Sequence, residues 1–280
     1  MYIQKNNSTV VSIVVPTCNR ASLLQKMTES VLMQSFSDWE LLAIDDVSTD
    51  DTETIMRNYC SKDSRIKYFR IPADNTKGIY KYLNYGMNTA QGKYISRLDD
   101  DDYWYDKDTL KLQVEFLENN PEYVLVGGGV IIVDENYKEV FRYLKNENDK
   151  EIRKNALISN PFAHNTVMFI KEKALSIGGY ANLTFAEDWD LWLRLGKIGK
   201  FYNFQKHFTC YLSAGQNTSF KFQKQQTKTL SLLLKRYKND YPGFNLGYSL
   251  NFLQYLYSFL PVFIKKRFHN VLIYFKRNYF

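Results

Sequence analysis

The stretch KYISRLDDDD, residues 93–102, joins an apolar segment directly to four consecutive aspartates. Its first six residues have the length and composition of a buried strand, so they predict a strand that ends in carboxylates. Alternate residues of an extended segment face the same side, so Asp99 and Asp101 can address one ion. A divalent cation that also carries substrate phosphates suits such oxygen ligands. The alternative is a solvated loop that caps the helix expected from Asp108.

Short apolar strands and amphipathic helices alternate on both sides of this stretch. Strands are expected at residues 10–15, 40–44, 65–71, 93–98 and 123–134, and helices at 23–32, 48–59, 80–88 and 108–119. Ser48 or Thr49 is the expected cap of the second helix. Gly127, Gly128 and Gly129 interrupt the last strand, which indicates a bulge or a close approach of a ligand. The pattern predicts an α/β fold with a mainly parallel sheet.

Polar clusters follow three of the expected strands, at residues 17–20, 45–46 and 99–102. Ligands of open α/β sheets bind beyond the carboxyl ends of the strands, so we expect these clusters to form one site. The glycine-rich fingerprints of dinucleotide enzymes and P-loop NTPases are absent from the sequence.

A second acidic pair, Glu187-Asp188, comes just before an apolar stripe with helical spacing. Free N–H groups at a helix N-terminus keep a carboxylate ionised and fixed in direction, as a general base requires. Simple capping of the helix is the alternative. Arg194 follows on the same helix, where it would meet a donor phosphate, pair with the acidic cluster, or form a structural salt bridge.

The C-terminal part of the chain is basic and aromatic. After Asp190 the only acidic residue is Asp240, against fifteen Lys and Arg. Residues 250–264 are apolar but too short to span a bilayer, and Lys265-Lys266-Arg267 follows. We expect a catalytic domain at 1–220 and a helical extension at 221–280 that lies on a membrane surface. A helical lid packed on the catalytic domain is the alternative, and no nucleic acid partner is expected.

Five segments, in this order, resemble family 2 of the inverting glycosyltransferases, of the type that builds bacterial cell-surface polysaccharides. They are VSIVVPTCNR (11–20), LLAIDDVSTDD (41–51), LNYGMNTAQGKYISRLDDDDYW (83–104), HNTVMFIKEKALSIGGY (164–180) and FAEDWDLWLRL (185–195). The resemblance covers roughly residues 10–215 and implies the fold called GT-A. It also implies a nucleotide-sugar donor, a Mn²⁺ or Mg²⁺ ion, and displacement with inversion at the anomeric carbon.

The resemblance implies a role for each matching residue. Thr17 and Asn19 lie beside the nucleotide, and Asp46 accepts a hydrogen bond from its base, unless Asp45 or Asp46 merely caps the next helix. Asp99 orients the ribose or the metal's hydration shell, Asp101 binds the metal, and Asp100 and Asp102 stay ambiguous on the donor side. The general base is Asp188, with Glu187 and Asp190 nearby, and His164 lies on the acceptor or phosphate side or is simply a hydrogen-bonded structural residue.

Other positions depart from the family or have two interpretations. Leu83 and Leu212 stand where many relatives carry arginine, so Lys77 or Lys81 would have to meet the donor phosphate. Trp104 and Trp192 would stack on a sugar or pack in the core, and we favour the core for Trp192.

A UDP-sugar is the expected donor and a glycan or lipid-linked sugar the expected acceptor. The N-terminus lacks a secretory signal, which favours a cytoplasmic enzyme at the inner face of the membrane. One alternative is a sugar nucleotidyltransferase, although residues 11–20 lack its glycine-rich, basic phosphate loop. The other is a noncatalytic nucleotide- or glycan-binding module, although the metal and base carboxylates are present.

Overall fold

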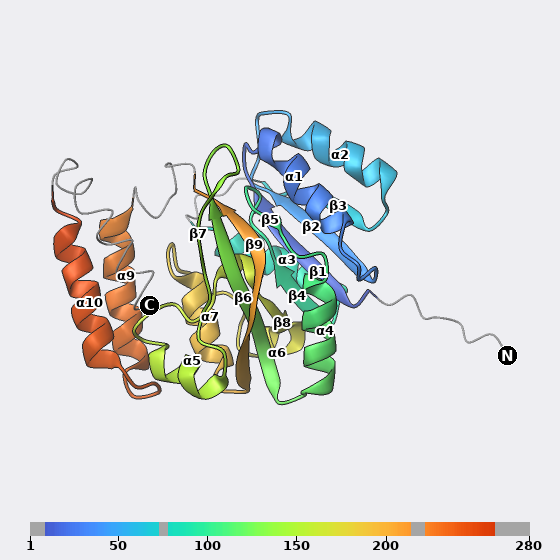
Figure 1. Ribbon diagram of the computed structural model, residues 1–280. Helices are drawn as coiled ribbons and strands as arrows, with labels where there is room; N and C mark the ends of the chain where they lie inside the picture. Colours follow the sequence, from blue (N-terminus) through green and yellow to red (C-terminus); the bar gives the residue numbers. More distant parts are fainter. Residues whose placement is uncertain (1–8, 73–77, 214–221, 261–280) are drawn as a thin grey trace.

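A computed structural model describes residues 9–72, 78–213 and 222–260. Its centre is a nine-stranded sheet in the order β3-β2-β1-β4-β8-β6-β9-β5, and the ninth strand, β7, pairs with the end of β6 beyond β8 (Figure 1). Helices cover both faces of the sheet. The predicted α/β class, with its GT-A-like arrangement, is therefore confirmed.

The N-terminal half is the parallel part of the sheet. Its strands are β1 (Val11–Thr17), β2 (Trp39–Asp45), β3 (Ile66–Arg70) and β4 (Tyr94–Arg97), joined through the helices α1 (Ala21–Leu32), α2 (Thr52–Lys62) and α3 (Tyr80–Thr89). These strands and helices match the predicted ones to within a few residues at most boundaries. Every residue of β1 and β2 is buried, as expected for strands covered on both faces.

The start of α2 differs from the prediction. The helix begins at Thr52, and neither Ser48 nor Thr49 caps it. Asp50 instead accepts hydrogen bonds from the backbone N–H of Thr52 (3.0 Å) and of Ala21 (3.0 Å). One carboxylate therefore binds free N–H groups in the first turns of both α1 and α2.

The second half of the sheet is mixed. Its strands are β5 (Tyr103–Trp104), β6 (Tyr123–Val133), β7 (Glu139–Tyr143), β8 (Met168–Ile170) and β9 (Lys200–Leu212), and β6 and β9 run parallel while the other new pairs are antiparallel. The predicted bulge is present, because the β6–β9 register shifts around Gly127 and Gly129. A Cβ on Gly128 would lie 2.3 Å from the Phe208 ring, so this glycine makes room for core packing.

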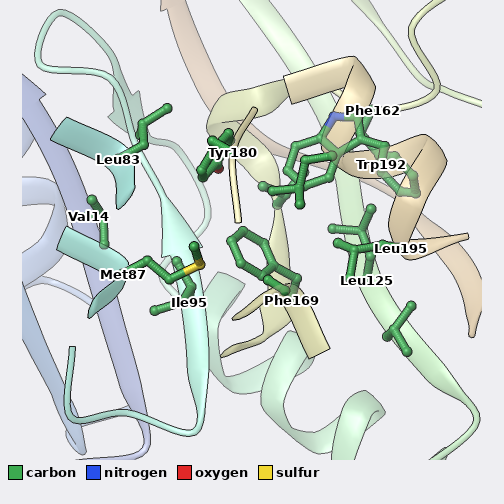
Figure 2. Packing of buried hydrophobic residues seen from close by; sticks show 14 of the residues in the cluster. Val14, Leu83, Met87, Ile95, Leu125, Phe162, Phe169, Tyr180, Trp192 and Leu195 are labelled. Atoms are coloured by element: carbon green, nitrogen blue, oxygen red, sulfur yellow. The ribbon is translucent and has the colours of Figure 1, made fainter. Parts of the chain in front are cut away.

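Two apolar layers hold the helices on the sheet. One face buries side chains of α1, α2 and α4 (Thr109–Asn119). The opposite face packs α3 and α7 (Glu187–Leu195) around Phe169 and Trp192, which Figure 2 shows together with Leu83 and Tyr180. Short elements complete this face, namely α5 (Asp149–Asn155), the 3-10 turn η1 (His164–Thr166) and α6 (Lys171–Ser176). Because α7 lies in this core, its first turn has a fixed position.

The chain continues into two antiparallel helices, α9 (Gln223–Tyr237) and α10 (Phe244–Tyr257), at the side of the domain (Figure 1). Leu233, Leu234 and Tyr237 of α9 pack against Trp189 and Leu193 of α7. In the part of the chain that the structure describes, no helix is both long and apolar enough to cross a bilayer. Lys77 and the predicted basic run at Lys265 lie outside the described residues.

Candidate active site

The loops after β1 and β2 are bonded to each other at the carboxyl edge of the sheet. The N–H of Asp46 donates to the carbonyl of Thr17 (2.9 Å). Asn19 has a left-handed backbone (φ 54°), and its Oδ1 accepts hydrogen bonds from the N–H (2.8 Å) and hydroxyl (3.2 Å) of Thr49. The structure thus brings together the residues expected beside the nucleotide, and Asn19 also has a structural task in joining the two loops.

The two aspartates after β2 have different surroundings. Asp45 is fully buried and accepts hydrogen bonds from the N–H and hydroxyl of Ser48 and from the Tyr68 hydroxyl (2.7 Å). Asp46 is half-buried; burial, and then its hydrogen bond with Tyr82, raise the pKa of that tyrosine to about 12. Neither aspartate caps α2. Asp46 is therefore the one of the pair positioned to reach a ligand.

The four aspartates after β4 separate into two groups. Arg97 binds Asp99 (2.5 Å), and Arg20 lies 3.7 Å from both Asp100 and Asp101. Asp102 is buried, and it accepts hydrogen bonds from Asn165 (2.5 Å) and from the N–H of Leu212 (3.0 Å). Asp102 therefore holds η1 and β9 in place, whereas the other three carboxylates surround the candidate site.

Negative charge exceeds positive charge in this cluster. Burial, and then the neighbouring Asp101, raise the pKa of Asp100 to about 7. Burial and Asp99 raise the pKa of Asp101, and Arg20 opposes both shifts only in part. A cation would relieve this repulsion, and the oxygens of Asp99 and Asp101 are ligands that Mn²⁺ or Mg²⁺ accepts. Among the described residues no group of three Asp, Glu, His or Cys is placed to hold a metal.

Glu187 and Asp188 form the first turn of α7. Ala186 is the N-cap residue, with a left-handed backbone (φ 59°), and no side chain caps the helix. Asp188 is therefore not the N-cap residue, although its carboxylate accepts hydrogen bonds from backbone N–H groups of the first turn. Its Oδ2 accepts a hydrogen bond from Asn160 Nδ2 (2.7 Å), a contact that the sequence did not predict.

Burial dominates the electrostatics of this pair. It raises the pKa of Asp188, despite hydrogen bonds from Asn160 and from backbone N–H groups. Burial and the charge of Asp188 raise the pKa of Glu187 to about 8. From the sequence, the helix terminus is expected to keep Asp188 ionised, which requires a lowered pKa. The pKa is raised, so that expectation is wrong. A carboxylate pKa raised above its usual value is nonetheless favourable for a general base that works at neutral pH.

Arg97 acts on both acidic groups. Arg97 is 1% exposed and binds Asp99, and its positive charge partly opposes the upward shift of the Glu187 pKa. Sequence reasoning missed this residue, although an arginine inside an apolar strand was a visible signal. Because one guanidinium influences Asp99 and Glu187, the strand-end cluster and the start of α7 belong to one site.

His164 is held by aromatic neighbours. Its Nε2 lies 3.0 Å from the Tyr180 hydroxyl, and its ring meets Trp192 edge-on at 5.7 Å between centroids. Burial, and then the charge of Arg97, keep its pKa well below the usual value, so the ring is neutral. These contacts agree with the interpretation of His164 as a hydrogen-bonded structural residue. A role of His164 on the acceptor or phosphate side stays a prediction.

Arg194 forms the structural salt bridge that was one of its three interpretations, and a contact with a donor phosphate stays a prediction. Its Nε binds Asp190 (2.7 Å), and its other nitrogens donate to the carbonyls of Ile177 (2.8 Å) and Gly179 (2.6 Å). These bonds fix the loop after α6 to α7. Asp190 is fully buried and also binds Arg236 and Tyr237 of α9, which removes it as a substitute base.

The remaining candidates belong to the core or its border. Trp104, Trp192, Leu83 and Leu212 are buried, so Trp104 cannot stack on a sugar. Lys81 lies over the ring of Tyr82, 4.6 Å from its centroid and on the Asp46 side of the site. It is the basic residue on α3 that could reach a phosphate.

Comparisons with known proteins agree on a family. The model of glycosyl transferase family 2 matches residues 12–178. A putative glycosyltransferase of Bacillus subtilis, EpsE, is 34% identical over 206 residues, 72% of either chain. A Campylobacter jejuni enzyme, GalNAc(5)-diNAcBac-PP-undecaprenol beta-1,3-glucosyltransferase, is 31% identical over 202 residues, which are 72% of this chain and 64% of that one. The match thus spans slightly less than two thirds of the Campylobacter protein.

Solved structures share the fold. The Pyrobaculum calidifontis mannosyltransferase in complex with GDP-Man and Mn²⁺ superposes with a TM-score of 0.64 over 87% of this chain and 69% of that one, at 17% identity. Staphylococcus aureus TarS 1–349 in complex with UDP-GlcNAc gives a TM-score of 0.62 over 80% of this chain and 66% of that one, at 19% identity. At these identities the likeness concerns the fold alone.

Proposed function

The chain belongs to glycosyl transferase family 2, and we propose that it transfers a sugar from a nucleotide sugar to a hydroxyl group of a glycan or lipid-linked acceptor. A UDP-sugar is the first candidate donor. The observation that carries this proposal is the position of Arg97, which binds Asp99 of the strand-end cluster and acts electrostatically on Glu187, the neighbour of Asp188. A metal-and-diphosphate site and a base for an incoming hydroxyl are the two parts that sugar transfer needs.

On the donor side, the Thr17–Asn19 loop borders the nucleotide, and Asp46 accepts a hydrogen bond from an N–H of the base. An ionised carboxylate suits this role because it only accepts hydrogen bonds. Asp99 and Asp101 would hold Mn²⁺ or Mg²⁺, which supplies positive charge to the departing diphosphate. Arg20, close to Asp100 and Asp101, adds a fixed positive charge at the same place.

On the acceptor side, Asp188 takes the proton of the attacking hydroxyl. The acceptor oxygen forms its bond to the anomeric carbon while the bond from that carbon to the diphosphate oxygen breaks, which inverts the configuration. Asn160 holds the carboxylate of Asp188 in direction through the 2.7 Å hydrogen bond. Glu187 keeps the basicity of the pair high, because two close carboxylates resist losing both protons.

The class of acceptor is inferred from relatives. The name of the Campylobacter protein describes an undecaprenol-linked acceptor, and an Escherichia coli relative, 32% identical over 170 residues, is an O-antigen biosynthesis glycosyltransferase. We therefore place this enzyme in the biosynthesis of a cell-surface polysaccharide. A nucleotidyltransferase fits less well, because the loop after β1 lacks a glycine-rich phosphate cradle. A noncatalytic module fits less well because both sets of carboxylates are present.

A donor screen tests the proposal. Purified protein is titrated with UDP-, GDP- and dTDP-sugars by calorimetry, with Mn²⁺, with Mg²⁺ and with EDTA, and slow hydrolysis of each donor is followed in parallel. We expect one nucleotide to bind with a metal and not with EDTA. Absence of binding by every nucleotide sugar, in protein shown to be folded, would refute a nucleotide-sugar transferase.

A further inference from the structure

The helices α9 and α10 place a row of lysines beside a row of aromatic rings. Lys224 Nζ lies 4.4 Å from the ring centroid of Phe259, and Lys235 Nζ lies 5.2 Å from that of Tyr248. These contacts mark the two ends of the antiparallel pair. Helical spacing puts Lys228 between the two lysines, and puts Phe252 and Tyr255 between the two rings.

Next to the aromatic row, α10 exposes leucines. Phe252 is 51% exposed, Phe259 54%, Leu253 59% and Leu256 49%. Leu232 of α9, one turn from Lys228 and Lys235, is 69% exposed. Large apolar side chains gathered in this way, rather than scattered singly, mark an interaction surface. We call this surface the α9–α10 face, made up of Lys224, Lys228, Leu232, Lys235, Phe252, Leu253, Leu256 and Phe259.

Positive charge predominates in the segment that forms the face. Residues 222–260 contain five Lys and Arg and a single acid, Asp240, which pairs with Lys197 (2.7 Å). Lysine stems can lie along apolar surface while their ammonium groups reach outward. Basic groups bordering exposed aromatic and leucine side chains are complementary to the interface of an anionic bilayer, where apolar side chains enter the acyl region and lysines meet the headgroups.

We propose that the α9–α10 face docks on an anionic lipid bilayer, with both helices lying in the interface. In this arrangement the contact is peripheral, because the helices lie along the membrane surface and do not cross it. The inference does not depend on the proposed function, because lipid binding is measured without donor or acceptor. If the acceptor is lipid-linked, this contact holds the enzyme at the surface that contains it.

Vesicle flotation with the full chain tests the proposal. We expect binding to vesicles of phosphatidylcholine with phosphatidylglycerol, weaker binding in high salt, and little binding to phosphatidylcholine alone. Substitution of Lys224, Lys228 and Lys235 together by Gln should weaken binding by about a hundredfold, since each lysine near an anionic surface contributes about fivefold. The matched control replaces Lys107, Lys111 and Lys173, which are exposed elsewhere, by Gln and should change binding much less.

A second set of variants tests the apolar side chains of the α9–α10 face. Phe252→Ser with Phe259→Ser, or Leu253→Ser with Leu256→Ser, should reduce vesicle binding in high salt while thermal melting stays near that of the parent. The proposal would be overturned if the full chain did not bind anionic vesicles. So would binding that survives the lysine and phenylalanine variants, since residues outside the face would then carry it. A dimer in light scattering that these serine variants dissociate would identify the face as a contact between two copies.

Discussion

Tyr237 of α9 donates a 2.8 Å hydrogen bond to Oδ1 of Asp190, two residues after Asp188 on α7. Asp190 is fully buried, and its other oxygen binds Arg194. The C-terminal helices are therefore attached, through a buried carboxylate, to the helix that carries the proposed general base. Loosening this contact should disturb the first turn of α7 without touching any substrate.

Tyr237→Phe tests this attachment. Burial and Asp190 raise the pKa of Tyr237 to about 12, so the hydroxyl is a donor at neutral pH. Loss of a hydrogen bond to a charged group costs about 1.5–3 kcal/mol, and we expect that loss in urea unfolding. We also expect kcat to fall more than KM changes. Tyr248→Phe on α10 is the control and should be close to neutral. Unchanged kcat in Tyr237→Phe would mean that α9 does not position α7.

The raised pKa of Glu187 predicts a pH dependence of stability. Its pKa is about 8 in the folded protein and ~4.3 when unfolded, so between these values the folded state holds more protons. The free energy of unfolding should therefore be largest below about pH 4.3, as far as this group is concerned, and fall as the pH rises to 8. Glu187→Gln should flatten part of that slope in urea unfolding measured across the range. If Glu187→Gln leaves the slope unchanged, other carboxylates cause the pH dependence of stability.

Asp101→Ala should abolish the metal dependence of donor binding. Removing one oxygen ligand leaves the diphosphate charge poorly compensated beside the remaining aspartates. Calorimetry with the donor found in the screen, with and without Mn²⁺, measures the effect. Asp38→Ala, at an exposed position before β2, is the matched control. A folded Asp101→Ala protein that binds donor and metal as the parent does would leave the acidic cluster with a structural role only.

The order of strands and helices was predictable because each element carries its own pattern. The buried runs of β1 and β2 and the helical spacing of α1 and α4 are local signals, so the parallel half of the sheet follows from them. The gathering of Thr17, Asp46 and Asp99 at one edge of the sheet was also predictable, because parallel strands end at the same edge. The antiparallel strands β5, β7 and β8 were missed because short strands of two to five residues carry little pattern.

The role of a single polar residue was less predictable, because it depends on partners far away in the sequence. Asp45 and Asp46 are adjacent, yet Tyr68 and Ser48 engage only the first. Arg194 binds carbonyls of the loop after α6, which its own helix gives no reason to expect.

Asn160→Ala should slow the reaction without large loss of stability. Asn160 lies in the loop after α5, and its amide holds one oxygen of Asp188 at 2.7 Å. Without that bond the carboxylate can rotate away from the acceptor hydroxyl. A poorly oriented base gives a smaller rate enhancement, so we expect about a tenfold lower kcat. The pH profile should also move to higher pH, because the amide lowers the pKa of Asp188. An unchanged profile and kcat would show that Asn160 does not position the base.

Asp188→Asn separates chemistry from binding, because it keeps the shape of the side chain and removes the base. General-base assistance contributes about 10²–10⁴-fold, so kcat should fall by that range while donor affinity stays near the parent value. Stability should not fall much, since Asp188 is not the N-cap residue of α7 and the variant loses an unfavourable buried charge. Glu187→Gln is the matched variant: it removes the neighbouring ionisable group and should retain far more activity. Near-normal turnover in a stable Asp188→Asn protein, with a large loss in Glu187→Gln, would make Glu187 the base.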